Sequence, residues 1–335
     1  MKRVLVTGGA GFVGSHLVDA LVRGAAEVHV VDSFLTGRPR NLAHLSGSRV
    51  VVHRLDAAKA PYGRYDEIYH LASPASPPFY SRHQRKTLLV NSLGTLRTLR
   101  IAQRCGAKYL LASTSEIYGD PLVHPQPEWY RGNVNPIGPR SSYDEGKRFA
   151  EALVIAFVRE TNLDARIVRI FNSYGPRMRP DDGRMPSSFI SSALRGEPVR
   201  IDGSGNQTRS LCYIDDTVSG IRAAMKRGRA GEAYNIGRPD EISVKDFAAM
   251  VIRLVGSSSK LEFAAPREED IRQRRPDIRK ARRELNWSPR VPLGRGLPQT
   301  IAWFERDRLE SAASARPRTR ASSADRGMLR VAEAS

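Results

Sequence analysis

A glycine-rich turn near the N-terminus constrains the fold more than any other feature of this sequence. Gly8, Gly11 and Gly14 follow a short apolar run at 2–7 and lead into a helical pattern at 12–23. Glycine permits a tight turn and lets the backbone approach a ligand, while the helix N-terminus offers unpaired N–H groups and partial positive charge. The arrangement predicts a cradle for a pyrophosphate, with a purely structural turn as the alternative.

An acidic residue after the second strand-like run narrows the ligand. Asp32 stands eighteen residues after Gly14. A carboxylate there accepts hydrogen bonds from an adenosine ribose and repels a 2′-phosphate, which favours NAD over NADP. Arg38 and Arg40 lie close by and weaken that preference. Asp56, after the third strand, is a candidate for the adenine edge, although a helix cap or turn role is nearly as good an interpretation.

Apolar runs of strand length alternate with helical patterns through the first half of the chain. This alternation predicts a Rossmann-type, doubly wound parallel sheet. The second half is rich in Gly, Pro, Asp and Arg, and suits a smaller lid domain. Strands are expected at 2–7, 28–32, 50–55, 67–72, 108–113 and 165–172, and helices at 88–105 and 144–161. The expected units are 1–172 joined by 210–240, then 173–209 with 241–309, and a disordered tail at 310–335.

The charge balance of the chain is strongly basic. Fifty-four Lys and Arg oppose 35 Asp and Glu, giving +19. Such a charge is compatible with nucleic-acid or anionic-lipid binding, but no nucleic-acid motif is visible. No apolar run approaches the ~18 residues that a membrane span needs. Cys105 and Cys212 are too few for a disulfide framework and fit no metal-ligand pattern. We expect a cytoplasmic protein without metal, nucleic-acid or membrane partners.

A tyrosine and a lysine four residues apart are candidates for proton transfer. Tyr143 and Lys147 share one helix face, and a nearby ammonium lowers a phenol pKa. A tyrosinate can take a hydroxyl proton while NAD takes the hydride. The pair is common by chance, but it gains weight because Thr114, Ser115 and Glu116 stand at the carboxyl end of a strand, where ligands bind. A capping box opening a short helix is the alternative for that segment.

Longer segments carry a resemblance that covers about residues 1–305. The chain resembles the extended short-chain dehydrogenase/reductases that act on nucleotide sugars, and among them the UDP-glucuronate decarboxylases, or UDP-xylose synthases. The segments that carry this likeness are HLASPASPP (70–78), LLASTSEIYGDPLVHPQPE (110–128), NVNPIGPRSSYDEGKR (133–148), RIFNSYGPRMRPDDGR (169–184) and QTRSLCYIDD (207–216).

The resemblance implies a set of site residues. As catalytic residues it implies Tyr143, Lys147, Glu116, Ser115, Thr114 and Arg274. For NAD it implies Gly8, Gly11, Phe12, Val13, Gly14, Asp32, Ser33, Thr36, Gly37, Asp56, Leu71 and Ser73, with Tyr143 and Lys147. For the substrate it implies Asn172, Arg184, Arg209 and Arg274, the last as a fixed cation for the sugar carboxylate. A homodimer through helices 88–105 and 144–161 is also implied.

The reaction implied by the resemblance is redox-neutral. NAD takes a hydride from C4 of UDP-glucuronate, the 4-keto sugar loses CO₂, and the hydride returns to give UDP-xylose. Glu116 argues against a 4-epimerase or a 4,6-dehydratase, the runner-up functions, and the intact site argues against a non-enzymatic RNA-associated protein. Leu89-Val90 departs from the usual Lys-Thr of the family. This departure leaves open how the substrate carboxylate is contacted or how the dimer surface is formed.

Overall fold

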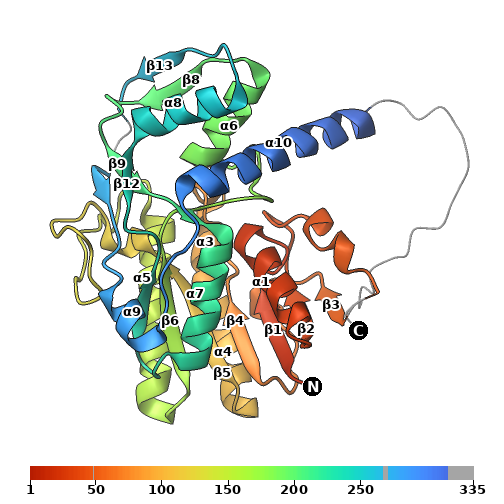
Figure 1. Ribbon diagram of the computed structural model, residues 1–335. Helices are drawn as coiled ribbons and strands as arrows, with labels where there is room; N and C mark the ends of the chain where they lie inside the picture. Colours follow the sequence, from red (N-terminus) through yellow and green to blue (C-terminus); the bar gives the residue numbers. More distant parts are fainter. Residues whose placement is uncertain (48, 267–270, 316–335) are drawn as a thin grey trace, which may run out of the picture.

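A seven-stranded parallel sheet forms the larger of two structural units (Figure 1). The computed structural model describes residues 1–47, 49–266 and 271–315. The strand order β11-β6-β5-β4-β1-β2-β3 shows that the chain winds outward in both directions from β1, which confirms the predicted doubly wound fold. The strands are β1 (Arg3–Thr7), β2 (Glu27–Val31), β3 (Val50–His53), β4 (Glu67–His70), β5 (Lys108–Thr114), β6 (Ala165–Ile170) and β11 (Ala233–Ile236).

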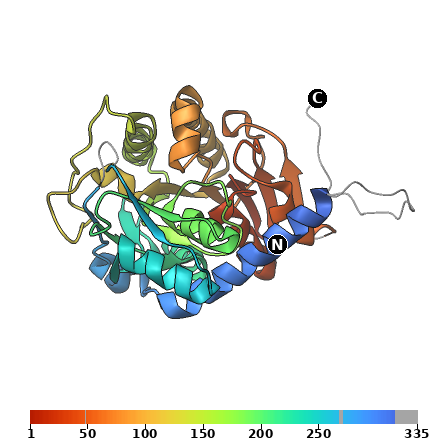
Figure 2. The same ribbon diagram turned by 90° about the horizontal axis from the view of Figure 1, so that it is seen from above.

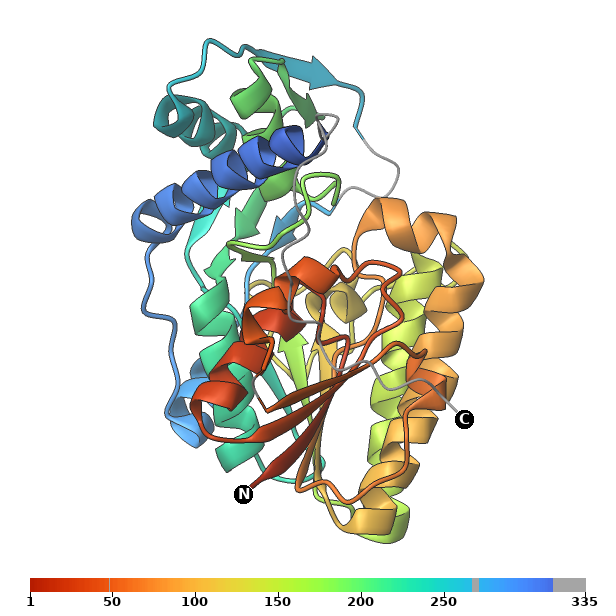
Figure 3. The same ribbon diagram turned by 90° about the vertical axis from the view of Figure 1, so that its right-hand side faces the viewer.

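Alternating side chains of the strands build a core on each face of the sheet. In β1, Val4 and Val6 belong to one buried cluster, whereas Leu5 belongs to the other. Helices α1 and α7 cover the first face, and α4 and α5 cover the second, as Figure 3 shows. The helices of this unit are α1 (Phe12–Arg23), α2 (Pro77–Arg82), α3 (Gln84–Leu89), α4 (Thr95–Cys105), α5 (Ser141–Thr161) and α7 (Ile214–Arg227), with 3₁₀ turns at Pro39–Asn41, Ala43–Leu45, Ala57–Lys59 and Ser115–Tyr118.

The smaller unit lies beyond the carboxyl ends of the sheet strands (Figure 1). Two helices pack together there, and short strands pair around them. Ligands of doubly wound proteins bind at this edge, so the unit is placed to enclose a substrate. Its elements are α6 (Met185–Arg195), β8 (Val199–Asp202) with β13 (Leu261–Ala264), β9 (Thr208–Ser210) with β12 (Glu241–Ser243) and β14 (Gln273–Arg274), α8 (Val244–Val255) and α10 (Leu293–Ala315); β7 (Ser173–Tyr174) pairs with β10 (Cys212–Tyr213).

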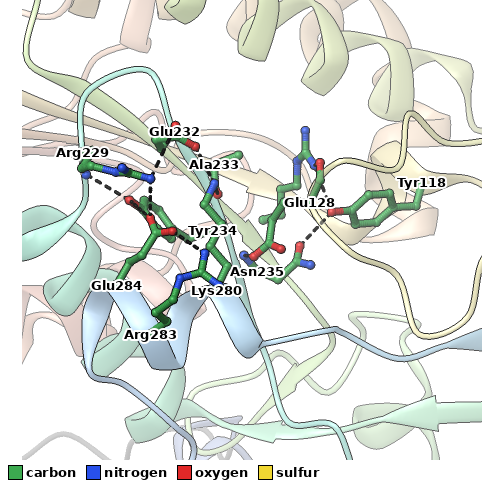
Figure 4. Close-up of polar contacts among 11 residues, drawn as sticks. Tyr118, Glu128, Arg229, Glu232, Ala233, Tyr234, Asn235, Lys280, Arg283 and Glu284 are labelled. Carbon is green, nitrogen blue, oxygen red and sulfur yellow. Dashed lines mark hydrogen bonds and ion pairs between the residues drawn. The ribbon is translucent and has the colours of Figure 1, made fainter.

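Segments distant in sequence fasten the edge strand β11 (Figure 4). Lys280, on α9 (Arg279–Leu285), donates hydrogen bonds to Glu232 Oε2 at 2.5 Å and to the carbonyl of Ala233 at 2.8 Å. On the other side, the Tyr118 hydroxyl donates to Asn235 Oδ1 at 2.9 Å. The Asn235 amide donates to Glu128 Oε1 at 2.9 Å, so this bond and the one to the Ala233 carbonyl satisfy backbone groups that the strand edge would otherwise leave unpaired.

One predicted helix is interrupted. The pattern at 88–105 predicted a single helix, but a π-helical turn at Val90–Gly94 separates α3 from α4. Inside this wider turn, Asn91 Nδ2 donates to the Thr87 carbonyl at 2.8 Å and to Ser73 Oγ at 3.0 Å. A π-turn inserts an extra residue without changing which side chains are apolar, so periodicity alone did not reveal it.

The predicted tail begins too early. A low content of large apolar residues suggested a tail over 310–335, but α10 continues through Ala315. Residues 316–335 lie outside the described residues. Although α10 has 23 residues, neither it nor any other helix within the described ranges combines the length and apolarity needed to cross a membrane.

Candidate active site

The glycine turn between β1 and α1 has room for a ligand only because side chains are missing. Gly8 has φ +73°, and a Cβ on it would lie 2.8 Å from the amide nitrogen of Ala72. A Cβ on Gly14 would lie 2.1 Å from the carbonyl oxygen of Gly8. The N-terminus of α1 has no side-chain cap and no acidic residue in its first turn. Its free N–H groups therefore fit the pyrophosphate of NAD.

Asp32 lies directly after β2, against the same turn. Its carboxylate accepts hydrogen bonds from the amides of Ala10, at 2.9 Å, and Phe34, at 2.8 Å. A Cβ on Gly37 would lie only 2.7 Å from Asp32 Oδ1, so the loop closes over the carboxylate because residue 37 is glycine. Burial raises the pKa of Asp32, while the two amide bonds oppose that shift. A carboxylate has about four acceptor positions, which leaves capacity for a ribose diol.

A cavity of about 300 Å³ follows the glycine turn and collects most of the predicted cofactor residues. Gly37 does not line it and acts instead by making room for Asp32. Asp56 caps a 3₁₀ turn, with Oδ1 accepting from the Ala58 amide at 2.9 Å, which confirms the capping role; it also lines the cavity, so the adenine role stays a prediction. The predicted residues along this cavity are Gly8, Gly11, Phe12, Val13, Gly14, Asp32, Ser33, Thr36, Asp56, Leu71 and Ser73.

A second cavity of about 310 Å³ adjoins the first and shares Val13, Leu71 and Ser73 with it. Tyr143 and Lys147 face it from the first turns of α5, and the end of β5 with its following 3₁₀ turn adds Thr114, Ser115 and Glu116. The structure therefore brings five of the six predicted catalytic residues to one cavity next to the cofactor cavity. Thr114 also accepts a hydrogen bond from the Glu116 amide at 3.2 Å, as the capping interpretation requires.

The proton-transfer pair is fully enclosed in the protein alone. Tyr143 stacks on Tyr80 with ring centroids 5.2 Å apart. Burial is the dominant influence and raises the pKa of Tyr143, while a hydrogen bond with Thr114 opposes it. Lys147 Nζ donates to the Ala112 carbonyl at 2.8 Å, and burial lowers the pKa of Lys147 to about 7. The sequence predicted a lowered pKa for Tyr143, whereas in the ligand-free protein desolvation raises it.

Glu116 is held between two guanidinium groups. It forms ion pairs with Arg274 and Arg140. Arg274, only 1% exposed, also donates to Ser115 Oγ at 3.2 Å and to the Gly119 carbonyl at 3.0 Å. Burial alone would raise the pKa of Glu116, but the two guanidiniums outweigh it and lower the pKa to about 2. The carboxylate is thus an anion, and Arg274 lies behind it rather than along the cavity wall.

Arg140 is a cavity residue that the sequence reasoning missed. It precedes α5, lines the substrate cavity and also lies 3.5 Å from Asp144 Oδ2. Burial, followed by repulsion from Glu116, raises the pKa of Asp144. Arg140 stands in the quoted segment 133–148, but its partner Glu116 is 24 residues earlier. No local spacing links two residues so far apart, so only the fold reveals the pair.

The three predicted substrate residues other than Arg274 come from separate elements of the chain and meet at the second cavity. Asn172 follows β6, Arg184 immediately precedes α6, and Arg209 lies on β9. Arg184 also lies over the Phe12 ring, 5.9 Å from its centroid, at the junction of the two cavities. This arrangement brings two guanidinium groups to one cavity, and such groups suit phosphate oxygens.

Two further arginines line the cofactor cavity and were also missed. Arg177 donates to Asp19 Oδ2 of α1 at 2.8 Å, and Arg179 donates to the Thr36 carbonyl at 3.4 Å. Both link the segment after β7 to the NAD-binding unit. Both stand within the quoted segment 169–184, which therefore contained the signal.

Comparisons with known proteins agree with this geometry. Residues 4–237 match the NAD dependent epimerase/dehydratase family. UDP-glucuronic acid decarboxylase 1 of Xenopus tropicalis is 50% identical over 309 residues, covering 91% of this chain and 73% of the relative. The Arabidopsis thaliana protein of that name is 48% identical over 303 residues, covering 90% and 69%.

A solved structure adds a ligand-bound neighbour. A Bacillus cereus UDP-glucuronic acid 4-epimerase mutant, in complex with NAD and a UDP-4-deoxy-4-fluoro-glucuronic acid, has a TM-score of 0.82 and 29% identity, over 91% of this chain and 99% of that one. The family match spans the glycine turn, Asp32 and the Tyr143–Lys147 pair, and the glycine turn and Asp32 line one cavity. The chain belongs to the NAD-dependent epimerase/dehydratase family, with NAD as its cofactor.

Proposed function

We propose that this protein is an enzyme that converts UDP-glucuronate to UDP-xylose and CO₂. The observation that carries the proposal is the Glu116 anion, held between Arg140 and Arg274 beside Tyr143 in the substrate cavity. The relatives at about 50% identity are named UDP-glucuronic acid decarboxylases, whereas the 4-epimerase structure shares 29%.

In this proposal the two units divide the work. Residues 1–172 with 210–240 hold NAD, and residues 173–209 with 241–309 hold the UDP-sugar. The glycine turn takes the pyrophosphate and Asp32 takes the adenosine ribose. Asn172, Arg184 and Arg209 bind the UDP. Bound NAD supplies a hydride acceptor at C4 of the sugar and afterwards the hydride donor.

Oxidation at C4 depends on Tyr143. The phenol, once ionised, takes the proton of the C4 hydroxyl as the hydride leaves C4, and Thr114 and Ser115 hold that hydroxyl. Lys147 holds positive charge next to the phenol. Because burial raises the pKa of Tyr143 in the protein alone, the phenolate needs positive charge beside it, which protonated Lys147 and the cationic nicotinamide ring of bound NAD would supply.

Decarboxylation follows from the oxidised substrate. The 4-keto sugar is a β-keto acid, so the C5–carboxylate bond breaks with its electrons flowing into the ketone, and the enolate then takes a proton at C5. Arg140, which lines the substrate cavity, supplies positive charge near the leaving carboxylate and the enolate, and Arg274 adds positive charge from behind Glu116. Glu116 orients both guanidiniums. The hydride then returns to C4 and Tyr143 gives its proton back.

The product decides between this reaction and its competitors. Purified protein is incubated with UDP-glucuronate and NAD, and the products are read by mass spectrometry. We expect a product lighter by one CO₂ without net NADH. A product of unchanged mass would indicate a 4-epimerase. A 4,6-dehydratase removes the C6 hydroxyl, which UDP-glucuronate lacks, so that reaction is tested with UDP-glucose and read as loss of water. No turnover of either sugar with intact NAD binding would indicate a non-enzymatic protein.

We further propose that the protein acts as a homodimer in the cytoplasm. Four large apolar side chains are more than 40% exposed on α3, on the π turn after it and on α5: Leu88, Leu89, Leu93 and Phe149. Burying them against a second copy explains their exposure, and it explains Leu89 in place of a charged residue. Light scattering should give twice the monomer mass for the wild type. A Phe149→Glu variant should be monomeric, and a monomeric wild type would refute the dimer.

A further inference from the structure

The helix α10 joins the two units at the adenosine end of the cofactor cavity. It leaves the smaller unit and crosses toward α1 and the loop after β2, as Figures 1 and 2 show. Near its far end it carries Asp307, a carboxylate only 6% exposed. Asp307 Oδ1 lies 2.6 Å from an Arg40 nitrogen, and Oδ2 lies 3.9 Å from Arg38 Nη1. One buried acid of the second unit thus faces the two arginines that follow Asp32.

The position of Arg38 gives this pairing a consequence for the cofactor. Its amide donates to the Ala10 carbonyl in the glycine turn at 3.0 Å. The preceding residue, Gly37, touches the Asp32 carboxylate so closely that a Cβ would lie 2.7 Å from it. The side chain of Arg38 therefore begins next to Asp32, the group proposed to bind the ribose. Arginines at this place are the ones that accommodate a 2′-phosphate in NADP-dependent enzymes.

The local charges are otherwise unfavourable for NAD selectivity. Arg179 lines the same cavity, and Arg38 feels the charges of both Arg40 and Arg179. Against these three cations stand Asp307 and the more exposed Asp181, which lies 3.5 Å from Arg38 and accepts closer hydrogen bonds from Arg179, at 2.6 and 2.9 Å. Without Asp307, Arg40 would lose its 2.6 Å partner and Arg38 would keep only the longer contact with Asp181, so both guanidiniums would become better able to attract a dianionic 2′-phosphate.

We propose that Asp307 is a specificity-determining residue: by pairing with Arg38 and Arg40 it withholds both guanidiniums from a 2′-phosphate and keeps the enzyme selective for NAD. The proposal rests on the proposed binding of the adenosine ribose at Asp32. It also explains how a sequence with two arginines after Asp32 remains an NAD sequence. The second structural unit therefore takes part in cofactor choice through α10.

The experiment compares two variants that break the same ion pair but leave opposite charges. Asp307→Asn leaves the arginines free, whereas Arg40→Gln removes a cation. Affinities for NAD and NADP are measured by calorimetry on the full-length protein stripped of nucleotide. In Asp307→Asn we expect the NADP:NAD dissociation-constant ratio to fall about five-fold, the effect of one partly exposed charge pair, with NAD affinity within about two-fold of wild type. In Arg40→Gln we expect the ratio to stay or rise.

Each outcome bears on the proposal. An unchanged ratio in Asp307→Asn, or the same fall in both variants, would overturn it, since the pair would then serve only to dock α10. If Asp307→Asn does not fold, it is combined with Arg40→Gln, which removes both members of the closest pair and leaves Arg38 without Asp307; the ratio should then fall relative to Arg40→Gln alone, and no fall there overturns the proposal. Failure of the wild type to bind NAD would instead refute the cofactor site itself.

Discussion

Neutralising Glu116 should destabilise the protein as well as stop catalysis. Glu116→Gln keeps the shape of the side chain but leaves Arg140 and the buried Arg274 without their shared anion. The pKa of Glu116 falls from 4.5 to about 2 on folding, which corresponds to about 3 kcal/mol of stabilisation at neutral pH. Breaking a buried pair by removing one partner costs about the same, about 3–5 kcal/mol.

The pH dependence separates this electrostatic effect from a packing defect. Because the folded pKa lies below the unfolded value, the stabilisation is fully present above pH 4.5 and is lost as the pH falls through about 2. The free energy of unfolding is measured by urea denaturation at pH 7 and near pH 3, on the wild type, on Glu116→Gln and on Glu145→Gln. Glu145 is a partly exposed residue of α5 that pairs with Arg148 one helical turn away, so its variant should change stability by less than about 0.5 kcal/mol.

Two results would refute the reasoning. One is a Glu116→Gln protein as stable as Glu145→Gln at pH 7. The other is a stability difference between the wild type and Glu116→Gln that stays constant between pH 7 and pH 3. The first would mean that the arginines find other partners at no cost, and the second would mean that the carboxylate contributes through shape alone.

Three further predictions concern the cofactor turn and the proton-transfer pair. Gly14→Ala should lose about 3 kcal/mol of unfolding free energy and all measurable NAD binding, because its Cβ would meet the Gly8 carbonyl. Denaturation measures the first and calorimetry the second. The control Gly294→Ala, on open helix surface, should lose neither. Tyr143→Phe should bind UDP-glucuronate normally yet turn over at least about 100-fold more slowly; normal turnover would reject the assigned base. Lys147→Met should stabilise the nucleotide-free protein near pH 7, because burial lowers the folded pKa of Lys147 to about 7 from 10.5. The gain in melting temperature should shrink toward pH 10, and a gain that does not shrink would contradict this.

Local patterns predicted the sheet well because each strand obeys them. Apolar runs of strand length were separated by segments with helical spacing. A strand buried on both faces of a sheet is nearly continuously apolar, so such runs mark the strands. The helix predicted at 88–105 is interrupted by a π turn at Val90–Gly94. The pattern did not show this interruption, because a π turn keeps the same apolar face. The start of the tail was misplaced because Ala-rich residues 310–315 extend α10, where helix propensity outweighs the lack of large apolar groups.

The candidate site was predictable where chemistry lies close together in sequence. Their spacing in the sequence identified the glycine turn, Asp32 and the Tyr143–Lys147 pair, and the structure places them along two adjoining cavities. Arg140 and Asp307 did not, because their partners lie on other elements and a basic chain contains many arginines with no role in the site. In a chain with a net charge of +19, the sequence likewise did not show that Arg38 and Arg40 pair with Asp307.

The fate of the hydrogen at C4 tests the central claim most directly. UDP-glucuronate carrying deuterium at C4 is converted by the enzyme with NAD, with unlabelled NADH added in excess. If the hydride leaves C4 and returns within one closed site, the UDP-xylose retains deuterium at C4, its mass has fallen by one CO₂, and the free NADH stays unlabelled. Deuterium in the NADH pool, or a product that has lost CO₂ while carrying hydrogen at C4, would contradict the redox-neutral cycle on bound NAD.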